Sequence, residues 1–495
     1  MDYGMLKNGT DIRGVALDLD PTQKVDLSES CARDFGRAYA RFVRKMTGKD
    51  RISVALGRDS RLSGPALEKA LSEGLTEAGA DVVLTGLSST PAMFMILKET
   101  DLADASVMIT ASHLPANRNG FKFFLPSGGL ESGQLDELIR MAETKEAASS
   151  ERGRITSYDF MPVYARSLAE KVRAATGLPK PLAGLHIIVD AGNGSGGFYA
   201  RDVLEALGAD TEGSQFLDPD GRFPNHIPNP ENKEAMDSVC KQVAATHADF
   251  GIIFDTDVDR AAVVGEGGVP INRNRLIALI SAVLLSERPG TIVTDSVTSD
   301  GLTEFIEKHG GVHHRFMRGY KNVINESKRL NASGVYSPLA IETSGHAALR
   351  ENYFLDDGAY LVTKLLILLS RMKAKGSSVL EIIKDLPEPA EACEIRPVFK
   401  DPEKAHGLGE QIIQDFESYT SKLPYCRAAG SNYEGFRVNL DKDHGDGWLL
   451  LRMSLHEPIM PINFESRTNG GCEKIKSFLF GFLKNYPDLD ISPFL

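Results

Sequence analysis

Three carboxylates stand at alternate positions in the segment DTDVDR (255–260), which directly follows an apolar run at 250–254. Alternate residues of an extended segment point to the same side, so Asp255, Asp257 and Asp259 can converge on one hard divalent cation. Carboxylate ligands with few other protein donors suit Mg²⁺, which keeps its remaining positions for water or phosphate oxygen. The segment therefore predicts a magnesium site beside a phosphate, and the plainer interpretation is an acidic turn after a buried strand.

Two further loops carry polar groups that could take part in catalysis or ligand binding. In TASHLP (110–115), Ser112 follows a short apolar run, and its hydroxyl is a poor nucleophile unless a base, a metal or phosphate chemistry activates it. The plainer interpretation of that loop is a turn serine that bonds its own backbone. In ETSGH (342–346), a carboxylate, a small hydroxyl and an imidazole surround a glycine, and this mixture suits sugar hydroxyls.

The elements that position these loops repeat three times: an apolar strand, a loop of small polar residues, an amphipathic helix and a glycine-containing turn into another strand. The strands that open the three copies are expected at 52–56, 185–189 and 291–294. Strands that alternate with helices need crossover connections, so we expect largely parallel sheets with helices on both faces. The pattern predicts three similar doubly wound α/β domains with mixed, largely parallel sheets.

After residue 389 the pattern changes. A long helix is expected at about 403–423, followed by short strands at 435–440 and 448–453, which predicts a C-terminal antiparallel α+β domain. Breaks rich in small residues, glycine or proline near 142–154, 266–270 and 386–389 separate the domains. The predicted domains are 1–157 with the serine loop, 158–269 with the acidic segment, 270–387 with the ETSGH loop and 388–495 with the antiparallel strands, arranged around a central cleft.

Composition limits the possible functions and locations. The 495 residues are 42% hydrophobic and 25% charged, the profile of a globular protein, and the net charge of −12 works against binding to nucleic acid or anionic lipid. The most apolar runs, 276–285 and 361–369, are too short to cross a membrane. Five scattered cysteines without a CxxC pair fit a reducing compartment. We expect a cytoplasmic protein, or a plastid stromal one if a transit peptide was trimmed.

Taken in order, these segments resemble the α-D-phosphohexomutases of the phosphoglucomutase/phosphomannomutase type. In that family TASHNP carries a phosphorylated serine, DGDGDR holds Mg²⁺, a GExSGH loop binds the sugar and RxSGTEP binds a phosphate. This chain has TASHLP, DTDVDR, IETSGH and RMSLHEP in the same order, with GTDIRG near the start and GRDSRLSG at 57–64. The four motifs in this order are specific evidence for the resemblance, whereas any one of them alone would be weak evidence.

The resemblance implies a role for each matched residue. Ser112 would carry the transferable phosphoryl group and share Mg²⁺ with Asp255, Asp257 and Asp259. Lys122 would exchange a proton with the sugar hydroxyl, assisted by Arg13 or His113, and Arg260 would add positive charge. The residues implied to bind the substrate are Lys321, Glu342, Ser344, His346, Arg452, Ser454 and His456.

Four positions depart from the family pattern. Leu114 replaces the asparagine of TASHNP beside the serine, and Leu455 replaces a small residue of the phosphate loop. His456 replaces a threonine, and Pro461 stands where another arginine is common. Because side-chain donors are lost, we expect a weaker or differently shaped grip on the non-reacting phosphate.

The implied function is the interconversion of hexose 1-phosphate and hexose 6-phosphate, of glucose or mannose, through a phosphoserine and a bisphosphorylated sugar. Glucose 1,6-bisphosphate would be the intermediate and activator. The expected partners are hexose phosphates, without nucleic acid or membrane, and the expected assembly is a monomer or weak homodimer.

Three alternatives stay open from the sequence. A haloacid-dehalogenase-type phosphatase would use Asp255 as nucleophile with Lys321 and Asp356 and Asp357 downstream. A dinucleotide-binding protein would use the glycines of GNGSGG (192–197) with Asp210 or Glu212. A sugar-phosphate-binding relative without turnover would explain the departures in the phosphate loop.

Overall fold

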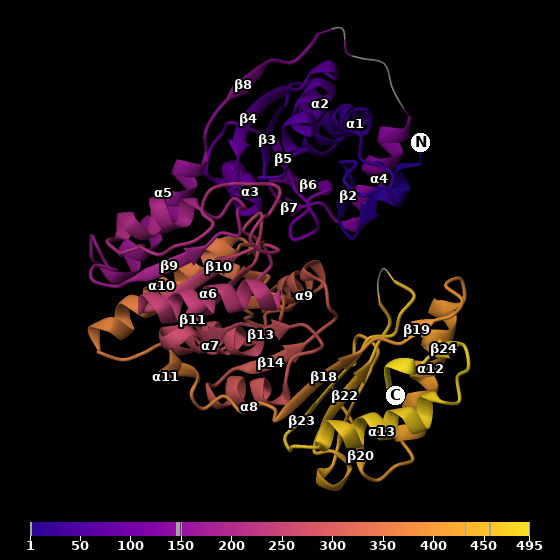
Figure 1. The fold of residues 1–495 in the computed structure, drawn as a ribbon. Coiled ribbons are helices and arrows are strands. Elements are labelled where there is room, and N and C mark those ends of the chain that lie inside the picture. Colours follow the sequence, from indigo (N-terminus) through magenta and orange to yellow (C-terminus); the bar gives the residue numbers. More distant parts are fainter. Residues whose placement is uncertain (1, 145–148, 150, 431, 455–456, 495) are drawn as a thin grey trace. The chain divides into compact units, whose positions relative to one another are not determined.

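The computed structural model describes residues 2–144, 149, 151–430, 432–454 and 457–494 (Figure 1). It consists of two compact units. The first contains Met1–Leu276 and Ser344–Glu381, and the second contains Ile277–Thr343 and Ile382–Leu495. Within the described ranges, every helix is too short or too polar to pass through a lipid bilayer.

A mixed sheet opens the first unit, in the strand order β1-β2-β6-β5-β3-β4-β8 with β7 paired to β6. β3 pairs in parallel with β4 and β5, and β6 runs antiparallel to β5 and β2. The strands are β1 (Lys7–Asn8), β2 (Asp11–Val15), β3 (Ser53–Arg58), β4 (Asp81–Leu87), β5 (Ala105–Ile109), β6 (Arg118–Leu125), β7 (Gly128–Gly129) and β8 (Ile155–Ser157).

Helices cover both faces of this sheet (Figure 1). They are α1 (Glu29–Thr47), α2 (Gly64–Glu77), α3 (Thr90–Glu99) and α4 (Ser132–Glu143). On one face α1, α2 and α4 share a buried cluster with Val107, Phe121 and Phe123. On the other face Phe94 of α3 meets Phe124, with ring centroids 6.2 Å apart. Because neighbouring residues of β6 point to opposite faces, Phe123 and Phe124 anchor different layers and fix the strand between them.

A smaller sheet follows in the first unit, in the order β12-β11-β10-β9. β9 and β10 are parallel, whereas β10, β11 and β12 form an antiparallel meander. The strands are β9 (Ile187–Asp190), β10 (Phe250–Phe254), β11 (Ala261–Gly265) and β12 (Val269–Ile271). The register pairs Phe254 with Ala261, so the acidic segment 255–260 forms the turn at the tip of this hairpin.

The remaining elements of the first unit surround that hairpin. α10 packs against α5, and β16 pairs antiparallel with β17. The elements are α5 (Met161–Thr176), a π-helix (Tyr199–Leu204) with a 3₁₀ turn (Glu205–Leu207), α6 (Lys233–Thr246), β16 (Ala347–Leu349), β17 (Leu355–Asp356) and α10 (Gly358–Ala374). α7 (Arg273–Glu287) runs from the first unit into the second.

The second unit combines a parallel sheet with an antiparallel one. β13 pairs in parallel with β14 and β15, and the order of the other sheet is β18-β23-β22-β21-β20. The elements of the parallel part are β13 (Thr291–Thr294), α8 (Asp300–Lys308), β14 (Val312–Arg315), α9 (Tyr320–Ala332) and β15 (Leu339–Ile341). Those of the C-terminal part are β18 (Glu391–Ile395), β19 (Val398–Phe399), α12 (Ala405–Thr420), β20 (Cys426–Ala428), β21 (Phe436–Leu440), β22 (Gly447–Leu451), β23 (Ile462–Ser466), α13 (Gly471–Leu483) and β24 (Leu489–Asp490).

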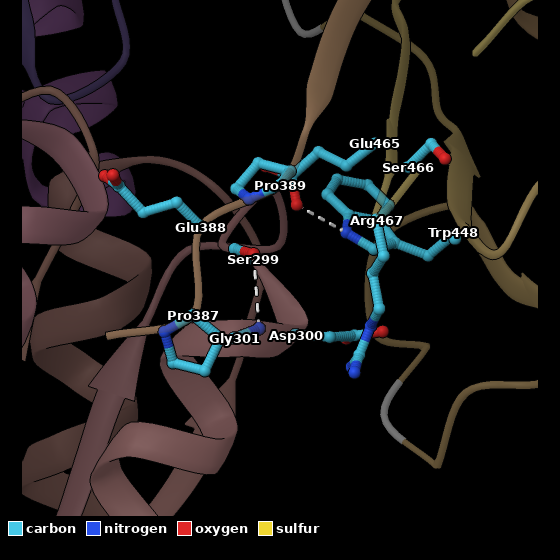
Figure 2. Close-up of a pocket in the computed structure, with 11 residues that line it drawn as sticks. Ser299, Asp300, Gly301, Pro387, Glu388, Pro389, Trp448, Glu465, Ser466 and Arg467 are labelled. Atoms are coloured by element: carbon cyan, nitrogen blue, oxygen red, sulfur yellow. Dashed lines mark hydrogen bonds between the residues drawn. The ribbon is translucent and has the colours of Figure 1, made fainter. Parts of the chain in front are cut away.

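A buried arginine holds these two parts of the second unit together. The guanidinium of Arg437 lies 3.5 Å from the ring centre of Trp448 and donates to the carbonyl oxygens of Ser296 at 3.0 Å and Thr298 at 2.9 Å. Beside it, a pocket of about 230 Å³ lies between the start of α8, the 387–389 linker and β22 (Figure 2). On the C-terminal side of this pocket, the indole N–H of Trp448 on β22 donates to Glu465 on the neighbouring strand β23 at 2.8 Å. The contacts of Arg437 thus link β21 to the loop that follows β13.

The predicted fold class is confirmed: α/β sheets with parallel strands come first, and an antiparallel α+β sheet with two covering helices closes the chain. One detail differs from the expectation. The second sheet contains a single parallel pair among its described strands, because β10 returns through a tight hairpin instead of a crossover helix.

Candidate active site

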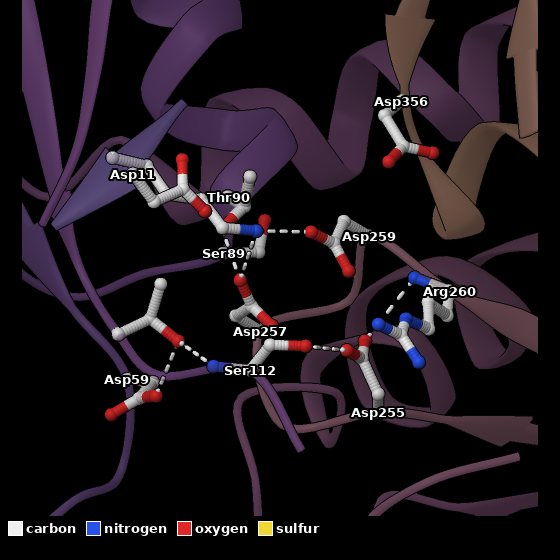
Figure 3. A network of polar contacts seen from close by, with 12 residues as sticks. Asp11, Asp59, Ser89, Thr90, Ser112, Asp255, Asp257, Asp259, Arg260 and Asp356 are labelled. Atoms are coloured by element: carbon white, nitrogen blue, oxygen red, sulfur yellow. Dashed lines mark hydrogen bonds and ion pairs between the residues drawn. The ribbon is translucent and has the colours of Figure 1, made fainter. Parts of the chain in front are cut away.

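The acidic turn between β10 and β11 buries three carboxylates in one place (Figure 3). One oxygen of each of Asp255, Asp257 and Asp259 lies within 4.8 Å of the others. The expectation of an extended segment is wrong, since these residues form a turn in which Val258 has a φ of 68°. A β-branched residue is strained in that region, and such strain persists where the surrounding structure enforces it, often at a functional site.

The residues of this turn fit a divalent cation. Asp257 Oδ1 and Asp259 Oδ1 are buried and have no hydrogen-bond partner in the structure. A buried carboxylate oxygen without a partner is costly, and oxygen ligands of this kind are those that hard cations prefer. Burial, followed by the charges of Asp259 and Asp257, raises the pKa of Asp255 well above its usual value. A bound cation would relieve that repulsion.

Ser112 lies directly beside this turn. It follows β5, is 4% exposed, and its hydroxyl donates to Asp255 Oδ2 at 2.8 Å. The φ of Ser112 is 50°, in the left-handed region that few residues other than glycine adopt. The local structure therefore imposes a strained backbone conformation that directs this hydroxyl at the carboxylates (Figure 3).

A fully buried arginine that the sequence did not single out holds the serine loop. Arg61 donates to the carbonyl oxygens of Leu114 at 2.6 Å, Pro115 at 2.7 Å and Arg118 at 3.0 Å, and also to that of Ser112. The bond to Leu114 uses its backbone, so the departure from asparagine there leaves this contact unchanged. One guanidinium thus binds four carbonyl groups of the loop.

Asp59 completes this support. It accepts a bond from Arg61 Nε at 3.2 Å and from the Thr110 hydroxyl at 2.7 Å, and that hydroxyl accepts the Ser112 N–H at 2.8 Å. Burial raises the pKa of Asp59, and Arg61 opposes that rise. Because both ions are fully buried, each depends on the other for compensation of its charge.

Lys122 and Arg13 bring positive charge to the carboxylates. Lys122 lies on β6, and its ammonium contacts Asp257 Oδ2 at 3.0 Å and also Asp259. Burial alone would lower the pKa of Lys122, but these two carboxylates raise it well above its usual value. Arg13 on β2 donates to Asp11 at 2.9 Å and to the Thr110 carbonyl at 3.1 Å.

Two histidines flank the site in different electrostatic environments. Burial, reinforced by Arg260 and Arg13, lowers the pKa of His113 to about 2, so this ring is neutral. His346 is also buried, which alone would lower its pKa, but the carboxylate of Asp356 raises it. Asp356 contacts His346 Nδ1, and Arg260 Nε donates to His346 Nε2 at 2.7 Å. Asp356, which the sequence suggested only for a phosphatase, therefore orients His346.

The glycine-rich loop 192–197 packs against the back of the acidic turn. The Ser195 N–H donates to the Thr256 carbonyl at 2.8 Å. A Cβ at Gly194 would lie 2.6 Å from that oxygen, and one at Gly197 would lie 2.2 Å from the Leu217 oxygen. These glycines are thus required by backbone packing, which accounts for the GxGxxG pattern without a dinucleotide.

Replacing Gly194 by alanine is expected to disturb the acidic turn. The added methyl group overlaps the backbone of Thr256, so we expect a destabilisation of about 1–3 kcal/mol and weaker binding of a divalent cation. Thermal unfolding and calorimetric titration with Mg²⁺ measure both effects. Gly133→Ala is the matched control, because nothing lies within 4 Å of its added Cβ. Equal cation affinity in both variants would contradict the packing argument.

Two residues expected to bind the substrate belong to the second unit. Lys321 lies in the first turn of α9, and Glu342 follows β15 and accepts the Gly319 N–H at 2.7 Å. Ser344 and His346, from the same sequence motif, belong to the first unit with Ser112. The motif 342–346 therefore spans the division between the units.

Arg452 and Ser454 also lie in the second unit. Arg452 is 6% exposed, and its Nη1 lies 3.5 Å from Glu434 Oε1. The Ser454 hydroxyl accepts the Glu457 N–H at 3.2 Å. Leu455 and His456, the two departures in this loop, lie outside the described residues.

Comparisons with known proteins cover nearly the whole chain. Family models described as phosphoglucomutase/phosphomannomutase α/β/α domains I, II and III match residues 5–149, 162–268 and 272–390. A phosphomannomutase/phosphoglucomutase of Pseudomonas syringae pv. tomato is 32% identical over 97% of this chain and 96% of its own length. A phosphoglucomutase of Neisseria gonorrhoeae is 30% identical over 94% of this chain and 95% of its own. A crystal structure of a phosphoglucomutase/phosphomannomutase family protein from Burkholderia thailandensis has a TM-score of 0.80 and 28% identity, covering 98% of each chain.

Fold, site and matches together define an enzyme, an isomerase of the phosphotransferase type. The chain belongs to the phosphoglucomutase/phosphomannomutase family, the α-D-phosphohexomutases. This membership favours a mutase over the haloacid-dehalogenase-type phosphatase.

Proposed function

We propose that this enzyme interconverts hexose 1-phosphate and hexose 6-phosphate, carrying the phosphoryl group on Ser112. The observation that supports this most directly is the buried hydroxyl of Ser112, 2.8 Å from Asp255 in a site that also holds Lys122. The names of the relatives, which include both phosphoglucomutase and phosphomannomutase, support glucose and mannose phosphates as substrates. A sugar bisphosphate is the proposed intermediate, so that glucose 1,6-bisphosphate would act as activator.

The proposed metal is Mg²⁺, held by Asp255, Asp257, Asp259 and the phosphorylated Ser112. When bound it would neutralise negative charge on the oxygens of the transferring phosphoryl group. The unpartnered oxygens of Asp257 and Asp259 and the all-oxygen donor set support this assignment.

The chain's own residues orient the reaction and supply its charges. Arg13 and Arg260 add fixed positive charge, and Lys122 is the proposed partner for the proton of the attacking or leaving sugar hydroxyl. His113 is neutral and can accept a hydrogen bond, whereas His346 is positioned by Asp356 to meet the sugar. Phosphoryl transfer depends chiefly on such positioning and charge.

The remaining motif residues are assigned to substrate recognition. Glu342, Ser344 and His346 would bind sugar hydroxyls, and Lys321, Arg452, Ser454 and His456 would hold the phosphate that does not react. Near this loop, the backbone N–H of Arg452 donates to the Pro461 carbonyl at 3.3 Å, a contact that does not depend on the side chain at position 461.

A coupled assay tests this function. Glucose 1-phosphate and mannose 1-phosphate are supplied separately, with and without glucose 1,6-bisphosphate, and formation of each 6-phosphate is followed. We expect conversion of at least one sugar, stimulation by the bisphosphate, and one phosphoryl group on the protein by intact mass. Tight binding of the bisphosphate without any conversion would instead favour the binding protein that lacks turnover.

Replacing Arg61 by lysine is expected to lower kcat by about 10²-fold with little change in KM, because a small displacement of the nucleophile has effects of that size. Lysine keeps a positive charge for Asp59 but cannot reach four carbonyl groups of the serine loop. Steady-state kinetics and thermal unfolding are compared with Arg51→Lys, an exposed position in the bend before β3. An unchanged kcat in Arg61→Lys would contradict the inference that this guanidinium positions Ser112.

We also propose four domains, 1–157, 158–271, 272–387 and 388–495. The predicted second boundary, 269/270, falls inside β12 (Val269–Ile271), which pairs with β11, so it is moved to the end of that strand. A cytoplasmic location and a monomer or weak homodimer stay predictions.

A further inference from the structure

Two of the five cysteines, far apart in the sequence, lie together in the C-terminal part of the second unit. Cys393 lies on β18, the first strand after the 387–389 linker, and Cys472 lies in the first turn of α13. The Cys393 thiol is one of the neighbours that raise the pKa of the Cys472 thiol. Neither cysteine belongs to a CxxC motif, so their spacing does not indicate a pair.

The backbone places these thiols together. Glu391 accepts the N–H groups of Gly470 at 2.7 Å and Cys472 at 2.9 Å, which fastens the start of α13 to β18. Alternate residues of a strand share one face, so Cys393 lies on the same face as Glu391 and Ile395. Ile395 packs against the buried cluster that contains Cys472. The cysteine between them must therefore also face α13.

The two thiols differ in access. Cys393 is exposed, whereas Cys472 is 6% exposed. Burial, with the neighbouring Cys393 and Glu391, raises the pKa of the Cys472 thiol to about 12, so it stays protonated. A dissolved oxidant reaches Cys393 first, and Cys472 is the thiol held next to it.

We propose that Cys393 and Cys472 form a reversible disulfide when the protein meets a peroxide. The Cys393 sulfur attacks hydrogen peroxide, forming an S–O bond while the O–O bond breaks and hydroxide leaves. The Cys472 sulfur then attacks the resulting sulfenic acid, the S–S bond forms, the S–O bond breaks and water leaves. In total two thiols lose two electrons and two protons, and the peroxide is reduced to two molecules of water.

The bond would join the first strand of the C-terminal sheet to the helix that covers it. β18 is the edge strand of that sheet, and the other four strands lie between Cys393 and Cys472 in the sequence. A crosslink that closes so long a loop restricts the unfolded chain and stabilises the folded one. The disulfide therefore protects this part of the enzyme under oxidising conditions, and a dithiol reductant releases it.

The other cysteine of the second unit cannot take part in this pair. Cys426 lies on β20, at the opposite edge of the same sheet. Burial raises the pKa of its thiol to about 11. It is therefore a matched control, partly buried and in the same sheet but at the edge opposite Cys393.

The experiment treats the reduced full-length protein with hydrogen peroxide in small excess. Thiols are counted before and after, peptides from a non-reducing digest are analysed by mass spectrometry, and the Tm is measured. We expect the loss of two thiols, a linked peptide pair containing Cys393 and Cys472, and a Tm higher by about 5 °C or more. Dithiothreitol should reverse all three.

Three variants make the result specific. Cys393→Ser and Cys472→Ala should each abolish the linked peptide and the rise in Tm, while Cys426→Ser keeps both. Cys393→Ser changes an exposed side chain, so it should fold normally and keep the activity of the reduced enzyme. Oxidation of Cys393 to a sulfinic acid while Cys472 stays a free thiol, or a disulfide between two chains through Cys393, would overturn the proposal.

Discussion

Replacing Ser112 by alanine is expected to lower mutase turnover by ~10³-fold or more, because removing a nucleophile from a preorganised site has effects of at least that size. The hydroxyl is buried and donates to Asp255 at 2.8 Å, and alanine removes this atom without adding volume. The protein should also lose the phosphoryl group that intact mass detects on the wild type. Substrate affinity should change far less, because alanine leaves the proposed sugar and phosphate ligands in place.

The control for this result is Ser127→Ala, an exposed serine in the turn after β6. It should keep both activity and phosphorylation. If Ser112→Ala stays phosphorylated and the phosphoryl group is found as an acyl phosphate on Asp255, the result would favour the phosphatase alternative over the phosphoserine mechanism. Wild-type turnover in Ser112→Ala would likewise contradict the assignment of Ser112 as the residue that carries the phosphoryl group.

The layered fold could be predicted because its signals are local. The apolar run 291–294 coincides with β13, and the expected helix at 403–423 contains α12 (Ala405–Thr420). Strand and helix periodicities are properties of short windows, so they survive without tertiary information. The hairpin return of β10 could not be predicted in this way, since an apolar run does not reveal whether the following strand pairs in parallel or antiparallel.

Only part of the site could be predicted from the sequence, again because sequence signals are local. Asp255, Asp257 and Asp259 are close in the sequence, so their convergence is visible there. Arg61 is not, because the carbonyl groups it binds lie about fifty residues further on and a carbonyl leaves no trace in side-chain identity. The signal that could have found it is the pair of opposite charges, Asp59 and Arg61, at a strand-to-helix turn in GRDSRLSG.

Two histidines that look equivalent in the sequence have different surroundings in the structure. His113 and His346 both lie next to matched motif residues, yet only His346 has a carboxylate, Asp356, against its ring. That contact raises the pKa of His346, whereas burial and two arginines lower that of His113. The division of labour between them therefore follows from the three-dimensional neighbours of each ring.

Replacing Asp257 by asparagine is expected to weaken Mg²⁺ binding and turnover by at least ~10²-fold, since even indirect changes to a metal site have effects of up to that size. The side chain keeps its shape but loses its charge, and the Asp257 Oδ1 that has no partner is among the atoms best placed to bind the cation. Calorimetric titration and the coupled assay measure both quantities. A chelator should likewise inactivate the wild type, and added Mg²⁺ should restore it.

The same substitution separates a metal role from a purely electrostatic one. Asp257 also accepts a bond from Lys122 at 3.0 Å, so asparagine disturbs the ammonium as well as the cation. If the carboxylate acts through the cation, high Mg²⁺ concentrations should recover part of the lost activity. If affinity for Mg²⁺ is unchanged while activity is lost, the carboxylate acts through Lys122 and the metal assignment fails. Asp237→Asn, a half-exposed aspartate on α6 that forms an ion pair with Lys233, should leave both quantities unchanged, because a surface ion pair contributes little.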